Sequence, residues 1–125
     1  MYKLLLVEDD RFTRELYELL FKQQGYQVET ASDGQAGFDL ASRGGYDLIL
    51  LDIMLPKKDG ISLLFQLKQL SPPISNQKIV MLTVLNQDKF IKRAMRLGAN
   101  GYLMKQALKP DEILAEVEVF LSSEN

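Results

Sequence analysis

The sequence contains neither cysteine nor histidine, and each absence excludes a class of site. Without cysteine, the chain can form no disulfide and no thiolate metal site. Without histidine, it lacks the commonest general base and the usual transition-metal ligand, and it cannot carry a phosphohistidine of its own. Metal-binding side chains in this protein must therefore be oxygen ligands.

Long apolar runs are also missing. No run approaches the roughly 20 residues that a membrane-spanning helix needs. The start, MYKLLLVEDD, turns acidic too early for a secretory signal, so we expect a cytoplasmic protein that does not contact a membrane. The net charge of -2 argues against nucleic acid as a direct partner.

The composition that remains is that of one globular domain. The chain has 125 residues, of which 46% are apolar and 26% charged. This is enough apolar material for a core, and it is unlike disordered or fibrous sequences. No linker, internal repeat or low-complexity tract divides the chain, so residues 1–125 are predicted to form a single domain.

Five short strands alternate with five helices along the chain. Buried strands are predicted at 2–7, 48–51, 78–83 and 101–104, and a more polar, alternating edge strand at 26–31. This alternation favours a doubly wound α/β fold, with a five-stranded parallel sheet between two helix layers.

The helix boundaries follow from capping and stop residues. Asp10 is a plausible N-cap and Gly25 a plausible stop for the first helix. Its spacing predicts an inward face of Phe12, Leu16, Leu19, Leu20 and Gln23.

Later helices have signals of the same kind. Ser32 and Gln35 have capping-box spacing for the second helix, which is expected to end near residue 43. The third helix is expected at 60–70 before Ser71-Pro72-Pro73, the fourth at 87–97 and the fifth at 110–122.

Side chains that carry chemistry follow four of the five strands. Glu8 and Asp9 come after the first strand, Asp52 after the third, Thr83 ends the fourth, and Lys105 follows the fifth. In an open parallel sheet, all carboxyl ends lie at one edge, so these side chains should converge. The second strand has no comparable side chain at its end, which places it outside the site and gives the order 2-1-3-4-5.

The converging carboxylates predict a magnesium site. Carboxylates this close repel one another unless a cation holds them, and an all-oxygen ligand set selects a hard divalent ion such as Mg²⁺. Asp9 and Asp52 would be direct ligands, with the backbone carbonyl of Met54 as a third and Glu8 in the outer shell.

Asp52 is then placed to act as a nucleophile. A carboxylate can accept a phosphoryl group and become an aspartyl phosphate. The metal, the Lys105 ammonium and the Thr83 hydroxyl would neutralise or bond the transferred oxygens. Each residue alone has an ordinary explanation, as a helix cap, turn residue, strand former or surface charge; only their joint placement indicates a site.

Four segments carry a resemblance to a known family: LLVEDD, LLDIMLPKKDG, IVMLT and GANGYLMK. In this order and spacing, they resemble the receiver domain of two-component response regulators, like the chemotaxis regulators, over essentially the whole chain. The resemblance implies a flavodoxin-like fold. It implies that Asp52 receives its phosphoryl group from a sensor histidine kinase or phosphotransfer protein, with Glu8 and Asp9 as the acidic pocket and Lys105 contacting the phosphoryl group.

The resemblance also implies a switch. Thr83 and Tyr102 would move together on phosphorylation and alter the face formed by residues 87–122. That face would contact an output protein or a fused effector domain, and it is also open to phosphorylation-dependent homodimerisation.

Two positions depart from the family pattern. Val84 stands where a small residue usually follows the switch threonine, and its bulk could narrow access to Asp52 or restrain Thr83. Gln106 stands where a proline usually follows the lysine with a cis bond; a cis bond before Gln106 would cost about 2.5–4 kcal/mol. We nevertheless expect Lys105 to point into the site.

Alternative functions fit the sequence less well. A dehalogenase-like phosphatase would need a second aspartate at position 54, where Met54 stands, so we expect no enzyme beyond self-phosphorylation and slow self-dephosphorylation. A receiver-like interaction module that is never phosphorylated stays open because of Val84 and Gln106. Neither nucleotide-binding glycine motif occurs, so no organic cofactor is expected.

Overall fold

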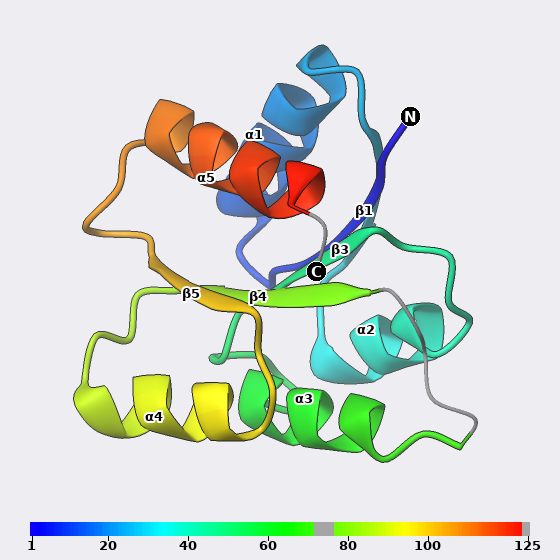
Figure 1. Cartoon of the computed structure of the whole chain (residues 1–125), viewed down its shortest axis with the longest axis vertical. Helices are drawn as coiled ribbons and strands as arrows, with labels where there is room; N and C mark the ends of the chain where they lie inside the picture. Colours follow the sequence, from blue (N-terminus) through cyan, green and yellow to red (C-terminus); the bar gives the residue numbers. More distant parts are fainter. Residues whose placement is uncertain (72–76, 124–125) are drawn as a thin grey trace.

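A parallel sheet of five strands lies at the centre of the computed structural model, which describes residues 1–71 and 77–123 (Figure 1). The order is β2-β1-β3-β4-β5, so the predicted topology is confirmed. The strands are β1 (Lys3–Val7), β2 (Gln27–Ala31), β3 (Leu48–Leu51), β4 (Lys78–Thr83) and β5 (Gly101–Met104).

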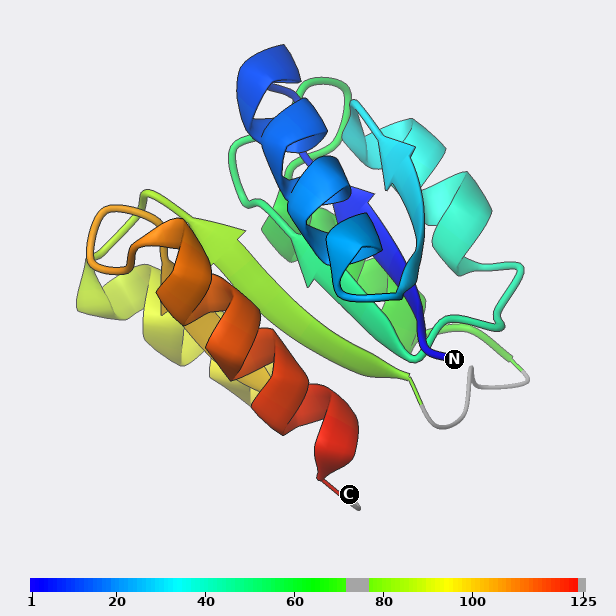
Figure 2. The same cartoon turned by 90° about the horizontal axis from the view of Figure 1, so that it is seen from above.

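Helices cover both faces of the sheet. One layer contains α1 (Arg11–Gln23) and α5 (Pro110–Ser122), and the other contains α2 (Gly34–Ala41), α3 (Gly60–Lys68) and α4 (Asp88–Arg96). Figures 1 and 2 show the two layers on opposite sides of the strands. The result is the expected three-layer α/β/α arrangement.

Successive side chains along the strands point to opposite faces of the sheet and enter two separate apolar cores. Leu48 and Leu50 of β3 belong to the apolar cluster under α1 and α5, whereas Ile49 and Leu51 belong to the cluster over α2, α3 and α4. All four side chains are fully buried, as a central parallel strand requires. In the same way, the alternating burial of β2 confirms that it is an edge strand.

The predicted inward face of α1 is wrong in most of its members. Phe12, Leu16 and Leu19 are 87%, 44% and 54% exposed, whereas Tyr17 and Phe21 are buried. The two buried rings stack with their centroids 5.8 Å apart, and they fill the space over the sheet. The apolar stripe of the first two turns is therefore left facing solvent.

The capping predictions hold for α1 and fail for α2. The Asp10 carboxylate accepts a hydrogen bond from the Thr13 N–H, and Gly25, at φ 91°, follows the helix. The N-cap of α2 is Asp33 rather than Ser32, and α2 ends at Ala41, earlier than expected. The carboxylate of Asp33 accepts from the Ala36 N–H, so it takes the capping role one residue later.

The remaining helices lie close to their predicted ranges. The predicted stop at Pro72 and Pro73 lies outside the described residues. Within 1–71 and 77–123, none of the helices is long and apolar enough to cross a membrane.

Candidate functional site

The carboxyl edge of the sheet gathers three acidic side chains. Glu8 and Asp9 follow β1, and Asp52 follows β3, its neighbour in the sheet. A carboxylate oxygen from each lies within 4.8 Å of one from each of the others. Glu8 and Asp52 are buried, whereas Asp9 is exposed and forms the solvent side of this acidic pocket.

Lys105 lies across the pocket from the acids. Its ammonium donates one hydrogen bond to Asp52 Oδ2, at 2.9 Å, and another to Glu8 Oε1. The backbone N–H of Lys105 donates to the Thr83 carbonyl at 2.8 Å, which extends the β4–β5 pairing one residue beyond β5. The side chain therefore points into the site, with Gln106 as the following residue.

Burial and charge act on this pocket together. Burial raises the pKa of Glu8 above its ordinary value and outweighs the opposing hydrogen bonds from Lys105 and the Asp10 N–H. Burial alone would lower the pKa of Lys105, but its hydrogen bonds to Glu8 and Asp52 prevail and raise it. Lys105 is therefore a firmly held cation facing an acid that is costly to ionise.

The backbone around Asp52 fixes its direction. The Met54 N–H donates to Asp52 Oδ1 at 3.2 Å, and the Gly60 N–H donates to the Ile53 carbonyl at 2.8 Å. A Cβ at Gly60 would lie 2.0 Å from the Asp52 carbonyl oxygen, so only glycine permits this closeness. The start of α3 is thus packed directly against the residue that carries the candidate nucleophile.

Arg14 supports the other side of the pocket, and the sequence reasoning missed it. Its guanidinium donates to the backbone carbonyls of Glu8 and Asp9, at 3.0 and 3.1 Å. It thereby holds the turn that presents both acids. A cation one helical turn after the Asp10 N-cap was the available signal.

Gly34 was also missed, although it positions the loop after β3. Its N–H donates to the Pro56 carbonyl at 3.1 Å, and a Cβ on it would lie 1.8 Å from the Lys58 carbonyl oxygen. Beside this contact, Lys57 has φ 68° and pairs with Asp33 at 3.6 Å. The start of α2 therefore holds the loop that carries Met54.

The predicted switch residues share one backbone partner. The Leu85 N–H donates to the Thr83 hydroxyl at 3.4 Å, and the Tyr102 hydroxyl donates to the Leu85 carbonyl at 2.7 Å. Thr83 is fully buried and Tyr102 half-buried. The segment between β4 and α4 thus connects the two side chains.

The two departures from the family pattern directly follow Thr83 and Lys105 in the chain. Val84 is 39% exposed, and together with Met104 and Gln106 it lines a hollow of about 160 Å³.

The residues present fit a divalent metal. The three carboxylates are hard oxygen donors, and Lys105 is the ammonium bound to this cluster, so two negative charges remain when all are ionised. Hard divalent cations such as Mg²⁺ prefer this combination of ligands and charge.

Comparisons with known proteins agree with this arrangement. The family model described as the response regulator receiver domain matches residues 4–118. The transcriptional regulatory protein DltR of Streptococcus agalactiae is 37% identical over 119 residues, covering 94% of this chain and 50% of DltR. The chemotaxis protein CheY of Treponema pallidum is 34% identical over 107 residues, covering 83% of this chain and 72% of CheY.

Solved structures give the same result. The non-phosphorylated HemR receiver domain from Leptospira biflexa superposes with a TM-score of 0.89 at 26% identity, covering 100% of this chain and 98% of that one. The BeF3-activated receiver domain of Klebsiella pneumoniae RstA has a TM-score of 0.84 at 31% identity, covering 97% and 99%. The chain spans about half the length of DltR, the first of these curated relatives.

Proposed function

This chain belongs to the response regulator receiver domain family, and we propose that Asp52 is its phosphoacceptor. The observation that carries the proposal is the Lys105 hydrogen bond to Asp52, made beside the cluster of Glu8 and Asp9. A cation and a cluster of hard oxygen ligands thus surround one buried carboxylate at the edge of the sheet where open α/β folds bind ligands.

Each side chain has a distinct task in the transfer. An Asp52 carboxylate oxygen attacks the phosphorus of a phosphohistidine, the bond from phosphorus to imidazole nitrogen breaks, and an aspartyl phosphate forms. Lys105 remains charged and bonds a transferred oxygen, and the Thr83 hydroxyl bonds another. Asp9, Asp52 and the Met54 carbonyl would hold Mg²⁺, with Glu8 in the outer shell. When bound, Mg²⁺ neutralises the charge on the transferred oxygens.

We infer no turnover of separate substrates. A phosphatase of the dehalogenase type needs an acid two residues after the nucleophile, and Met54 occupies that position with its side chain 55% exposed. The chain therefore catalyses only its own phosphorylation and the slow hydrolysis of the resulting aspartyl phosphate.

The exposed apolar side chains of α1 favour a protein, rather than a small molecule, as the phosphodonor. The stripe of Phe12, Leu16 and Leu19 is exposed, and it begins directly after the turn that presents Asp9. Exposed apolar side chains at this spacing suit contact with another helix. A helix of a sensor kinase or phosphotransfer protein, docked here, would present its phosphohistidine toward the acidic pocket.

The output follows from the connection through Leu85. When the Thr83 hydroxyl turns to the phosphoryl group, the Leu85 N–H loses its acceptor, and the segment that also binds Tyr102 shifts. The face at 87–122 would then change its affinity for an output protein, an attached effector domain or a second copy.

The test is intact mass after incubation with Mg²⁺ and acetyl phosphate. We expect a single phosphoryl adduct on the unmodified chain and on the matched control Asp39→Asn, an exposed aspartate of α2. We expect no adduct on Asp52→Asn, or on any variant when a chelator replaces Mg²⁺. An unmodified chain that binds Mg²⁺ and stays at its original mass would overturn the proposal in favour of the non-phosphorylated interaction module.

A further inference from the structure

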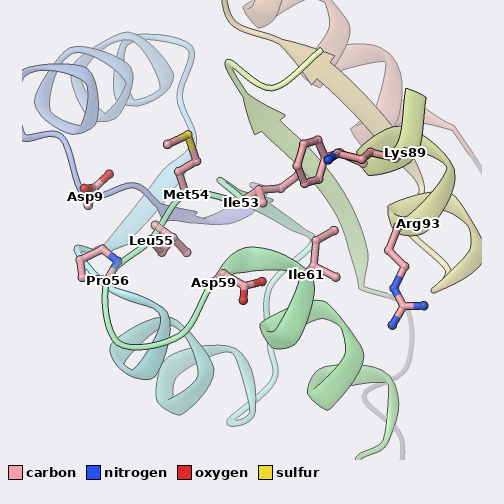
Figure 3. A pocket seen from close by; sticks show the side chains of 10 residues that line it. Asp9, Ile53, Met54, Leu55, Pro56, Asp59, Ile61, Lys89 and Arg93 are labelled. Atoms are coloured by element: carbon pink, nitrogen blue, oxygen red, sulfur yellow. The ribbon is translucent and has the colours of Figure 1, made fainter. Parts of the chain in front are cut away.

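A groove runs along α3 and α4 from the rim of the acidic pocket. Its first part, about 830 Å³, lies between the loop after β3, the start of α3 and α4 (Figure 3). A second hollow of about 280 Å³ continues between α3 and α4. Both are lined by Ile61 and Arg93, so they form one surface, the α3–α4 groove.

The floor of the α3–α4 groove is apolar. Ile53, Leu55, Ile61 and Phe90 line the first part, and Phe65 lines the second with 47% of its surface exposed. Exposed apolar surface in a concave site, rimmed by charge, is typical of an interaction site.

The charged side chains at the rim of the α3–α4 groove differ in whether they already have a partner within the protein. Lys89 and Arg93 stand one helical turn apart on α4, and neither takes part in a salt bridge with any residue of 1–71 or 77–123. The Asp59 carboxylate already caps α3, accepting from the Ser62 N–H at 2.9 Å and hydroxyl at 3.0 Å. Asp9 belongs to the acidic pocket.

Lys89 also strengthens the cationic character of the groove. Its ammonium lies 5.1 Å from the centroid of the Phe90 ring, so it is held over the floor. Figure 3 shows Lys89 and Arg93 extending from one helix, facing the side that carries Asp59 and Ile61. A ligand in this groove would meet apolar contacts below and two cations along one wall.

We propose that the α3–α4 groove binds an acidic amphipathic peptide segment of a partner protein. Apolar side chains of the segment pack on Ile61 and Phe65, and its carboxylates pair with Lys89 and Arg93. A peptide suits the site better than an anionic membrane, because the carboxylates of Asp9 and Asp59 also line the groove and would repel a continuous layer of anionic headgroups. The binding needs neither Asp52 nor Mg²⁺.

The probe is a fluorescent peptide of about ten residues that carries leucines on one face of a helix and glutamates along the flank next to that face. Fluorescence anisotropy is measured with the unmodified chain in the presence of a chelator. We expect saturable binding, weakened about tenfold or more by Arg93→Glu because a charge pair becomes a repulsion. Phe65→Ser should weaken peptide binding to a similar degree, because it removes an apolar contact from the floor of the groove. The same peptide with lysine in place of glutamate should not bind.

Two matched variants separate the groove from the general surface. Lys92→Glu makes the same charge change on an exposed face of α4 outside the groove lining, and Val119→Ser removes an exposed apolar side chain from α5. Both should bind the probe as the unmodified chain does. Equal losses in Lys92→Glu and Arg93→Glu would overturn the proposal, and so would binding to anionic phospholipid vesicles without binding to the peptide.

Discussion

The Lys105 ammonium donates a hydrogen bond to Asp52 Oδ2 at 2.9 Å, and this contact joins the ends of β5 and β3 across the end of β4. The same ammonium also binds Glu8, so one cation serves two buried carboxylates. The pocket depends on Lys105 for its stability before any chemistry takes place.

Replacing Lys105 should therefore destabilise the fold. We expect Lys105→Met to lower the free energy of unfolding at neutral pH by about 3 kcal/mol, because it leaves buried carboxylates without a cation. Urea denaturation without Mg²⁺ measures this loss. The double variant with Glu8→Gln should lose less, since one of the two buried charges is gone; equal losses would contradict this account.

The pH dependence of stability should carry the signature of Glu8. The pKa of Glu8 in the folded chain is raised above its ordinary value of 4.5. Between pH 4.5 and the raised pKa, the folded chain therefore binds more protons than the unfolded chain. The unfolding free energy contributed by Glu8 should therefore fall as pH rises from 4.5 through the raised pKa. Glu8→Gln removes this contribution, so the difference between the two proteins should change with pH. Parallel curves would show that Glu8 titrates normally.

Gly34→Ala should damage both stability and the site. A Cβ there would overlap the Lys58 carbonyl, so we expect a loss of about 3 kcal/mol as the loop after β3 moves away. Phosphoryl adduct formation should slow, because that loop carries Met54. The control is Gly45→Ala, where φ is 91° and nothing lies within 4 Å of the added Cβ. It should cost about 1 kcal/mol and leave adduct formation unchanged.

Val84→Ala should speed the reaction with acetyl phosphate several-fold. The substitution removes branched bulk from the residue directly after Thr83, and it should change stability by less than about 1 kcal/mol because Val84 is 39% exposed. Val84→Thr keeps the branched shape and should react like the unmodified chain. The rates are followed by intact mass. Equal rates in all three proteins would mean that position 84 does not limit access to Asp52.

Tyr102→Phe tests the connection through Leu85. Losing the hydroxyl should cost about 1 kcal/mol of stability, because the Leu85 carbonyl loses its partner. Adduct formation should remain normal, whereas the amide signals of α4 in NMR spectra should shift less on phosphorylation than in the unmodified chain. A full-size shift would show that the signal does not pass through this hydrogen bond.

The fold could be predicted because its main signals are local. Each buried strand is a short apolar run, and the polar residues after four of them fixed the strand order through the geometry of parallel sheets. The same rule placed Asp52, Thr83 and Lys105 at one edge. Their chemical roles stay predictions until the phosphorylation experiment is done.

What the sequence could not decide were choices between equivalent patterns. On α1, Phe12 and Leu16 have the same spacing as Tyr17 and Phe21, and only the shape of the space over the sheet selects the second pair. The close approach of Gly34 to Lys58 joins residues far apart in sequence, so no local pattern reveals it.

The strict alternation of β3 between two cores has a consequence for how this family member can diverge. Exchanges of one apolar residue for another within Leu48–Leu51 alter packing but leave the strand in register. An insertion or deletion of a single residue would exchange the two faces, bury each side chain in the opposite core and turn Asp52 away from Lys105. Apolar substitutions in β3 should therefore preserve the site, whereas a change in the length of β3 should destroy it.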